Sequence, residues 1–339
     1  NTTGDCNITI GHCAMGSAVG AVNQIVIGHG ATGTGDNQTV IGNSNTTNTT
    51  MYGCVSAACF YGDGSNLTGI SGGGSLCGTT LTSGLKTTAL GCGALANNTG
   101  NGCFNTAVGF QAMYTNTQGN ESTAVGYQAL YSQTTSAWRN TAIGMHALYC
   151  STCGRSNTAI GYDSMCKNTT GEFNTASGID SLRANTTGTN NVALGRSSLD
   201  DNTTGGYNTA SGNYAMAQNT TGVRNTASGY RALYFGTSSS CNVAIGSGAL
   251  QDNTANENTA VGYQTLYKNT SGVRNVGMGY RAGCAITTGC DNTIIGYGTT
   301  GECTTWCNQI LIGCGVTAAG SNQTVIGNSN TTHTKLCGA

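Results

Sequence analysis

The sequence predicts an all-β fold, a parallel β-solenoid with about 17 residues per coil and about fifteen coils in its main block. Three observations predict it. A repeat of nearly constant period fills most of the 339 residues, Gly and Thr-Thr pairs interrupt every helix-length window, and each unit contains turn-forming residues. Such units bury their apolar faces only by stacking on one another.

Composition excludes several classes of protein. The chain has 54 Gly, no Pro, 7% charged residues and a net charge of −1. Its 12 Lys and Arg residues are too few and too scattered for the basic face of a nucleic-acid binder. No apolar run reaches the roughly 18 residues of a membrane-spanning helix. We therefore expect neither nucleic-acid binding nor membrane insertion.

The repeat reads approximately N-T-A-V-G-Y-Q-A-L-Y-x-N-T-T-G-x-x, and we number its positions 1 to 17 from the leading Asn. The T-A-V step alternates as a short strand does, and N-T-T-G forms a turn because Asn and Gly tolerate left-handed dihedral angles. The glycine of position 5 recurs in steps of 14 to 18 residues, at Gly91, Gly109, Gly126, Gly144, Gly161, Gly178, Gly195, Gly212, Gly229, Gly246, Gly262, Gly279, Gly296, Gly313 and Gly327.

The small residue at position 3 and the large apolar residue at position 9 are the expected core. Stacking at about 4.8 Å would align each position into a column, so that every coil buries one large side chain. The predicted core columns include Ala107, Ala142, Ala159, Ala176, Leu130, Leu148, Met165 and Leu250. A single coil buries too little apolar area to be stable alone, so we expect stability to come from stacking.

Asparagine recurs at positions 1 and 12. The position 1 amides are expected to bond to one another along the stack, which satisfies polar groups without charge. At position 12, Asn168, Asn185, Asn202 and Asn219 each begin an N-T-T triplet. This triplet predicts either a column of turns or a glycosylated outer edge.

The period fails in one internal stretch, which divides the chain. We predict the end of a first solenoid block over residues 1–52, a Gly-rich connector over 53–86, and the main block over 87–339. The sequence N-Q-T-V-I-G-N-S-N-T-T occurs twice, at residues 37–47 and 322–332. Each copy follows a shortened step of 14 residues, so the same closing module ends both blocks.

The N-T-A-V-G and I-G-N-S units resemble the parallel β-roll heads of trimeric autotransporter adhesins. The G-Y-Q-A-L and N-T-T-G elements, and the connector sequence G-D-G-S-N-L-T-G-I, resemble phage tail-fibre proteins. The resemblance covers residues 1–52 and 87–339. It implies a homotrimeric fibre in which three chains wind together, and an open solenoid edge would allow end-to-end filaments.

Cysteine spacing suggests bonds between coils. Cys290 and Cys307 are 17 residues apart, which places them at one position of adjacent coils, and Cys150 and Cys166 are 16 apart. Stacked Cα atoms about 4.8 Å apart fall within the range that a disulfide tolerates. Two interpretations stay open: bridges that staple a fibre outside the cell, or cysteines that replace small apolar residues.

Three positions are expected to face outward or lie at a subunit boundary. Position 4 accepts Ser as well as Ile, which places it at a subunit boundary or half exposed. Tyrosine recurs at positions 6 and 10, and the candidate contact stripe comprises Tyr127, Tyr162, Tyr230, Tyr263 and Tyr280. This stripe either contacts a cell-surface or glycan receptor or lies between protomers.

The residues of an enzyme are not grouped in this sequence. None of His12, His29, His146 and His333 falls in a triad pattern, and Cys150-Ser151-Thr152-Cys153 lacks the further ligands of a zinc site. We expect no catalytic residues, no cofactor and no metal. The adjacent Asp200 and Asp201 are interpreted as solvated turn residues.

These patterns together predict a structural fibre protein, an extracellular or cell-surface rod that is adhesive or forms filaments. The alternative is a phage or viral tail-fibre shaft that binds a host receptor, located on a virion. A remote alternative is an ice-binding solenoid, although the strand carries only one Thr where such proteins carry a T-x-T row.

Overall fold

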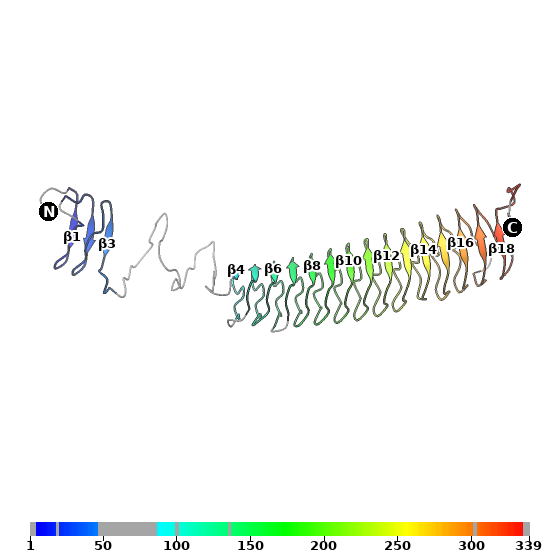
Figure 1. Cartoon of the computed structure of the whole chain (residues 1–339), viewed down its shortest axis with the longest axis horizontal. Helices are drawn as coiled ribbons and strands as arrows, with labels where there is room; N and C mark the ends of the chain where they lie inside the picture. Colours follow the sequence, from blue (N-terminus) through cyan, green and yellow to red (C-terminus); the bar gives the residue numbers. More distant parts are fainter. Residues whose placement is uncertain are drawn as a thin grey trace, which may run out of the picture. The chain divides into compact units, whose positions relative to one another are not determined.

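The computed structural model describes residues 5–17, 20–46, 87–98, 102–134, 137–300 and 304–334. The chain divides into two compact units, Asn1–Thr68 and Gly69–Ala339. The predicted connector, residues 53–86, lies outside the described residues, so the predicted domain boundaries stay a prediction. Within the described ranges all regular structure is β, which confirms the predicted all-β parallel solenoid (Figure 1).

Each coil contributes one strand of three residues. In the first unit these are β1 (Ile8–Ile10), β2 (Ile25–Ile27) and β3 (Thr39–Ile41). The second unit contains β4 (Thr88–Leu90), β5 (Thr106–Val108), β6 (Thr123–Val125), β7 (Thr141–Ile143), β8 (Thr158–Ile160), β9 (Thr175–Ser177), β10 (Val192–Leu194), β11 (Thr209–Ser211), β12 (Thr226–Ser228), β13 (Val243–Ile245), β14 (Thr259–Val261), β15 (Val276–Met278), β16 (Thr293–Ile295), β17 (Ile310–Ile312) and β18 (Thr324–Ile326).

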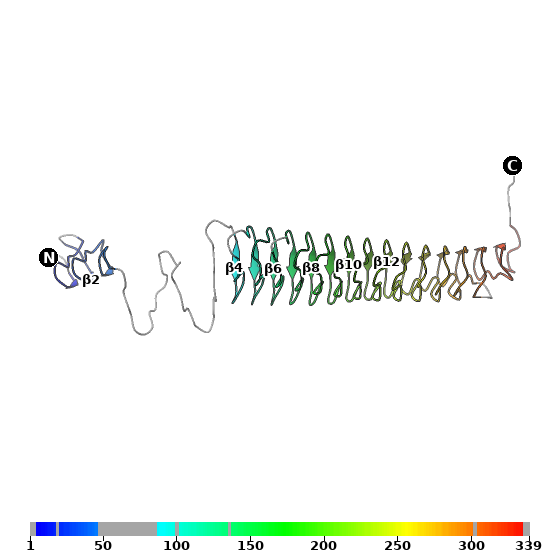
Figure 2. The same cartoon turned by 90° about the horizontal axis from the view of Figure 1, so that it is seen from below.

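The strands pair in parallel and in chain order, three in one sheet and fifteen in the other. They stack along one face of each block, and the turns return on the opposite side (Figure 2). The register follows the repeat, since Ala142 pairs with Ala159 and Ala159 with Ala176. Residues one period apart therefore lie over one another, as the sequence predicts.

The core consists of the predicted columns. Ala107, Ala142, Ala159, Ala176, Leu130, Leu148, Met165 and Leu250 are all fully buried. Alanine at position 3 lets the return segment approach the strand closely, and position 9 fills the remaining space with one Leu or Met per coil. The core is thin, so each coil depends on its neighbours for burial.

Glycine is required at position 5 by both its backbone angle and its surroundings. Gly178 has a φ of +144°, and a Cβ placed on it would lie 2.5 Å from the carbonyl oxygen of Gly195 in the next coil. The chain turns a corner here while two backbones pass in contact. No other residue type fits without displacing the neighbouring coil.

Three further positions adopt left-handed angles with ordinary side chains. In one coil these are Asp180 (φ 56°), Leu182 (φ 49°) and Asn190 (φ 57°), at positions 7, 9 and 17. Such angles cost roughly 1–2 kcal/mol per residue. The N–H group of each residue donates to a carbonyl of an adjacent coil: Asp180 to Tyr162 at 3.0 Å, Leu182 to Ser198 at 3.0 Å, and Asn190 to Glu172 at 3.1 Å. Stacking thus stabilises a coil that is strained in isolation.

Two asparagine columns satisfy the buried backbone. At position 1, the Asn174 side chain accepts the backbone N–H of Asn191 at 2.9 Å and donates to the carbonyl of Gly188 at 2.8 Å. At position 12, the amide of Asn185 donates to Asn168 Oδ1 at 2.8 Å, and that of Asn202 donates to Asn185 at 2.8 Å. The expected amide-to-amide bonds also occur at position 1, for example from Asn225 to Asn208, so both columns contain them.

We predict that Gly178→Ala lowers the free energy of unfolding by about 3 kcal/mol or more, because the methyl group would enter the adjacent backbone. The matched control is Gly298→Ala, where φ is +59° and a Cβ meets nothing within 4 Å. That control isolates the left-handed angle and should cost about 1 kcal/mol. Equal losses, measured by chemical denaturation, would contradict the contact between coils.

The position 12 column has a gap that can be repaired. Gly236 stands where Asn would continue the column, and Ser239 replaces the usual Gly of position 15. Within the described part of the chain, Asn219 Oδ1 and Ser239 Oγ are buried without a hydrogen-bond partner. A Cβ on Gly236 would lie 2.7 Å from Ser239 Oγ, so both positions must change together.

We expect the double variant Gly236→Asn/Ser239→Gly to raise the free energy of unfolding by about 1–3 kcal/mol, because it supplies a donor to Asn219 Oδ1. Gly236→Ala/Ser239→Gly is the control that fills the space without an amide. The midpoint of thermal unfolding should rise only for the first. A rise of the same size in both would show that packing, not hydrogen bonding, is responsible.

Candidate functional site

The strand face presents two rows of outward side chains. Because Ala at position 3 points into the core, the residues at positions 2 and 4 point outward, and the residue at position 6 follows the corner glycine. We call the position 4 residues the strand row and the position 6 residues the corner row. They lie on either side of the corner formed by glycine.

Both rows are largely apolar and exposed. The strand row includes Leu90, Val125, Ile143, Ile160, Leu194, Ile245, Met278, Ile312 and Ile326, which are 36–47% exposed. The corner row includes Phe110, Tyr127, Met145, Tyr162, Ile179, Tyr230, Tyr263, Tyr280 and Tyr297, which are 40–63% exposed. Single exposed apolar side chains are ordinary, but a contiguous run of them marks an interaction surface.

The candidate contact stripe lies entirely in the corner row. Tyr127, Tyr162, Tyr230, Tyr263 and Tyr280 are all exposed, as expected for a contact surface. The sequence shows no relation between this stripe and position 4, whereas the structure places them as two rows that flank the same glycine corner. The alternation of T-A-V was the signal that position 4 faces outward.

Aromatic rings of the corner row cover one another where coils with aromatic residues adjoin. Tyr263 and Tyr280 stack with ring centroids 5.3 Å apart, and Tyr280 and Tyr297 with centroids 5.0 Å apart. Stacked rings present their edges and hydroxyls outward, while their faces are occupied.

Five pairs of ionisable side chains link adjacent coils at positions outside the strand row. The pairs are Arg139–Glu121, Arg155–Glu172, Arg183–Asp200, Arg274–Asp291 and His146–Asp163, with N···O separations of 2.6–3.2 Å. Hydrogen bonding to Arg274 lowers the pKa of Asp291, and burial raises the pKa of Asp200. Asp200 is therefore a half-buried ion-pair partner rather than a solvated turn residue.

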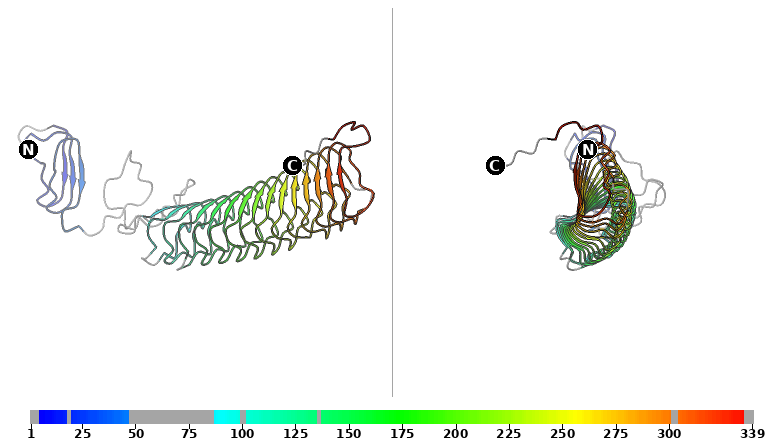
Figure 3. Two further views of the ribbon diagram at one scale, coloured as in Figure 1. Left: turned by 45° about the vertical axis from the view of Figure 1, so that its right-hand side comes forward. Right: turned by 90° about the vertical axis from the view of Figure 1, so that its right-hand side faces the viewer.

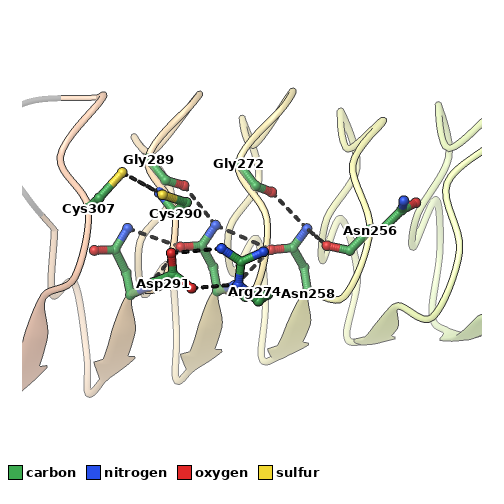
Figure 4. A network of polar contacts seen from close by, with 10 residues as sticks. Asn256, Asn258, Gly272, Arg274, Gly289, Cys290, Asp291 and Cys307 are labelled. Atoms are coloured by element: carbon green, nitrogen blue, oxygen red, sulfur yellow. Dashed lines mark hydrogen bonds and ion pairs between the residues drawn. The ribbon is translucent and has the colours of Figure 1, made fainter.

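The cysteines predicted to bridge coils form one close pair. Cys290 and Cys307 lie on adjacent coils with Sγ atoms 2.7 Å apart, beside the Arg274–Asp291 pair (Figure 4). Both cysteines are free in the structure, and the predicted disulfide stays a prediction. The hydrogen bond to Cys307 raises the pKa of Cys290 to about 12.

Cys150 and Cys166 are not in the same column. Cys150 occupies position 11 and Cys166 position 10, because their spacing is one residue short of the period. The backbone N–H of Cys150 donates to the Cys166 carbonyl at 2.9 Å, and the Cys166 thiol lies 3.8 Å from the Arg183 carbonyl oxygen. Burial raises the pKa of Cys166 to about 11, so its thiol is a weak nucleophile.

The N-T-T triplets belong to the interior. Asn168, Asn185, Asn202 and Asn219 are fully buried, and the Nδ2 atoms of the last three each donate to the Asn one coil earlier. A glycan on Nδ2 would replace these bonds and could not fit. The column of turns is therefore the correct interpretation, and a glycosylated edge at these four residues is wrong.

Comparison with known proteins does not assign the chain to a family, because no family model and no curated protein matches it. Across the described ranges no group of three or more His, Cys, Asp and Glu side chains is arranged to hold a metal ion. Nor does any helix there have the length and apolarity needed to cross a membrane. The strand row and the corner row are thus the candidate functional surfaces of this chain.

Proposed function

We propose that this chain is a structural fibre protein whose strand and corner rows bind further copies of itself, forming a homotrimeric rod. The observation that carries the proposal is the pair of long rows of exposed apolar side chains, which recur at most coils of the second unit. Burying apolar area gives about 25 cal/mol per Å², repeated at every coil. A rod gains affinity from many such contacts.

The chemistry of the rows favours association with identical copies. The strand row has no charged residue, and its interruptions are serines such as Ser177, Ser211 and Ser228. Copies aligned in register would place apolar residues against apolar residues at every coil except those with serine, with no like charges opposed in the strand row. The corner row contains one charged residue, Arg196.

The geometry suits a closed ring. The two rows flank the glycine corner, so each chain offers a wedge with an apolar surface on both sides. A wedge contacts a different neighbour on each side, and such contacts close into a cyclic oligomer. The resemblance to trimeric adhesin heads supports three copies. Seen along its axis, the second unit twists steadily, so partner chains would wind around a common axis (Figure 3).

A mechanical role follows for such a rod. We place it outside the cell or on its surface, where a nearly neutral fibre spaces or presents binding surfaces. The alternative is a viral or phage fibre, which the same architecture serves. Ice binding is disfavoured by the twist, and by the Thr186 and Thr203 hydroxyls, which donate to backbone carbonyls at 3.0 Å instead of facing water.

We predict that the wild-type chain sediments with three times the mass of a single chain. The double variant Ile143→Glu/Ile160→Glu should sediment with the mass of a single chain. Each glutamate would place a carboxylate in the buried interface, which should weaken trimer formation more than tenfold. Thr187→Glu/Thr204→Glu, on the exposed turn, is the matched control and should remain trimeric. A wild-type protein that is monomeric at tens of micromolar would contradict the proposal.

The state of the Cys290–Cys307 pair separates the two settings. In an oxidising compartment the pair should lose two protons and two electrons to a disulfide-exchange partner and form a bridge. In a virion assembled in a reducing cytoplasm both should remain thiols. Alkylation of denatured native-source protein, followed by mass spectrometry, reads this directly, with Cys166 as an internal reference. Free thiols at both positions would favour the viral fibre.

A further inference from the structure

The closing module has the same structure at the end of both sheets. Its described residues are 37–46, which include β3, and 322–332, which include β18. The corner glycine is Gly42 in the first copy and Gly327 in the second, with φ angles of 93° and 89°. The other corner glycines of the second unit have φ angles of 123–144°. The first copy is followed by nearly three hundred residues of sequence, so its form is not a consequence of the chain ending.

An ordinary corner is covered by the next coil. A Cβ on Gly212, for example, would lie 2.6 Å from the carbonyl oxygen of Gly229, because that backbone occupies the space directly above. The carbonyl of the following residue also receives a hydrogen bond from the next coil. Gly315 N–H, for instance, donates to the Tyr297 carbonyl at 2.8 Å.

In the closing module a threonine takes the place of that next coil. A Cβ on Gly42 would lie 2.8 Å from the Cβ of Thr46, and a Cβ on Gly327 would lie 2.7 Å from the Cβ of Thr331. The side chain four residues further along the chain therefore folds back over the corner. It fills the space that the backbone of an added coil would need.

An asparagine side chain replaces the hydrogen bond that the backbone N–H of position 7 gives in an ordinary coil. Asn43 Nδ2 donates to the His29 carbonyl at 2.6 Å, and Asn328 Nδ2 donates to the Cys314 carbonyl at 2.7 Å. Elsewhere this carbonyl accepts a backbone N–H from the following coil. The last complete corner is therefore satisfied without a further coil.

The threonine and asparagine also fix each other. The backbone N–H of Asn43 donates to Thr46 Oγ1 at 2.8 Å, and that of Asn328 donates to Thr331 Oγ1 at 3.0 Å. The side-chain oxygens of Asn43 and Asn328 accept the N–H of Asn45 and Asn330 at 2.9 and 3.0 Å. The same set of hydrogen bonds occurs in two independent copies.

We propose that the closing module is a cap that ends a solenoid block and prevents a coil of a second copy of this chain from adding at that edge. An exposed sheet edge otherwise recruits strands, so proteins protect it. The cap would leave lateral association through the strand and corner rows intact. It would make end-to-end growth at the β3 and β18 edges unfavourable.

The test is Asn328→Ala/Thr331→Ala in the full chain, with Thr332→Ala as the matched control. The double variant should give species of twice the wild-type assembly mass or more in sedimentation, and longer rods in electron micrographs, both increasing with concentration. The control should match wild type. The proposal is overturned if the double variant has a normal circular dichroism spectrum and keeps the wild-type assembly mass over a 100-fold range of protein concentration.

Two further readouts keep the test decisive if the double variant is unstable. Thr331→Val retains the bulk over Gly327 but removes the hydroxyl that accepts the backbone N–H of Asn328. This variant should keep the end closed, while the backbone N–H of Asn328 should exchange with solvent at least tenfold faster than in the wild type. Rods that lengthen in Thr331→Val would contradict the claim that the bulk of Thr331 blocks an added coil. A backbone N–H of Asn328 that is unprotected in the wild type would contradict its hydrogen bond to Thr331.

Discussion

Hydrogen bonds between adjacent coils are the interaction on which the fold depends. Most coils of the second unit contain three residues with left-handed angles and ordinary side chains, such as Asp180, Leu182 and Asn190, whose N–H groups donate to neighbouring coils. The angles are unfavourable alone, and the bonds exist only in the stack. The coil is therefore not an independent unit, and the block forms as an array.

The same constraint arranges the chemistry of the molecule. Polar groups are directed inward or along the stack, where asparagine amides and paired charges bond one coil to the next. Apolar side chains then occupy both the thin core and the outward rows. This distribution differs from that of a globular enzyme, and it supports a role in which the surface is repeated rather than concentrated in one site.

The repeat made the register and the core predictable, because residues such as Ala142, Ala159 and Ala176 recur at one spacing and can be stacked without knowing the coil's path. Local geometry was harder. Leucine at position 9 carries no sequence signal for a left-handed angle, and Asn168 resembles a glycosylation site although its side chain is buried. Cys150 and Cys166 were misaligned because a spacing of 16 shifts the column by one position. Predicting that the strand row and the corner row flank one corner required knowing how the backbone turns at the corner glycine.

Amide hydrogen exchange at Asp180, Leu182 and Asn190 tests the central claim most directly. If stacking holds these left-handed residues, their amides should be protected as strongly as the strand amide of Ala176 and should exchange together with it, when the block opens. Exchange of these three amides at the rate of an unfolded chain, while Ala176 remains protected, would show that the bonds between coils do not hold the backbone.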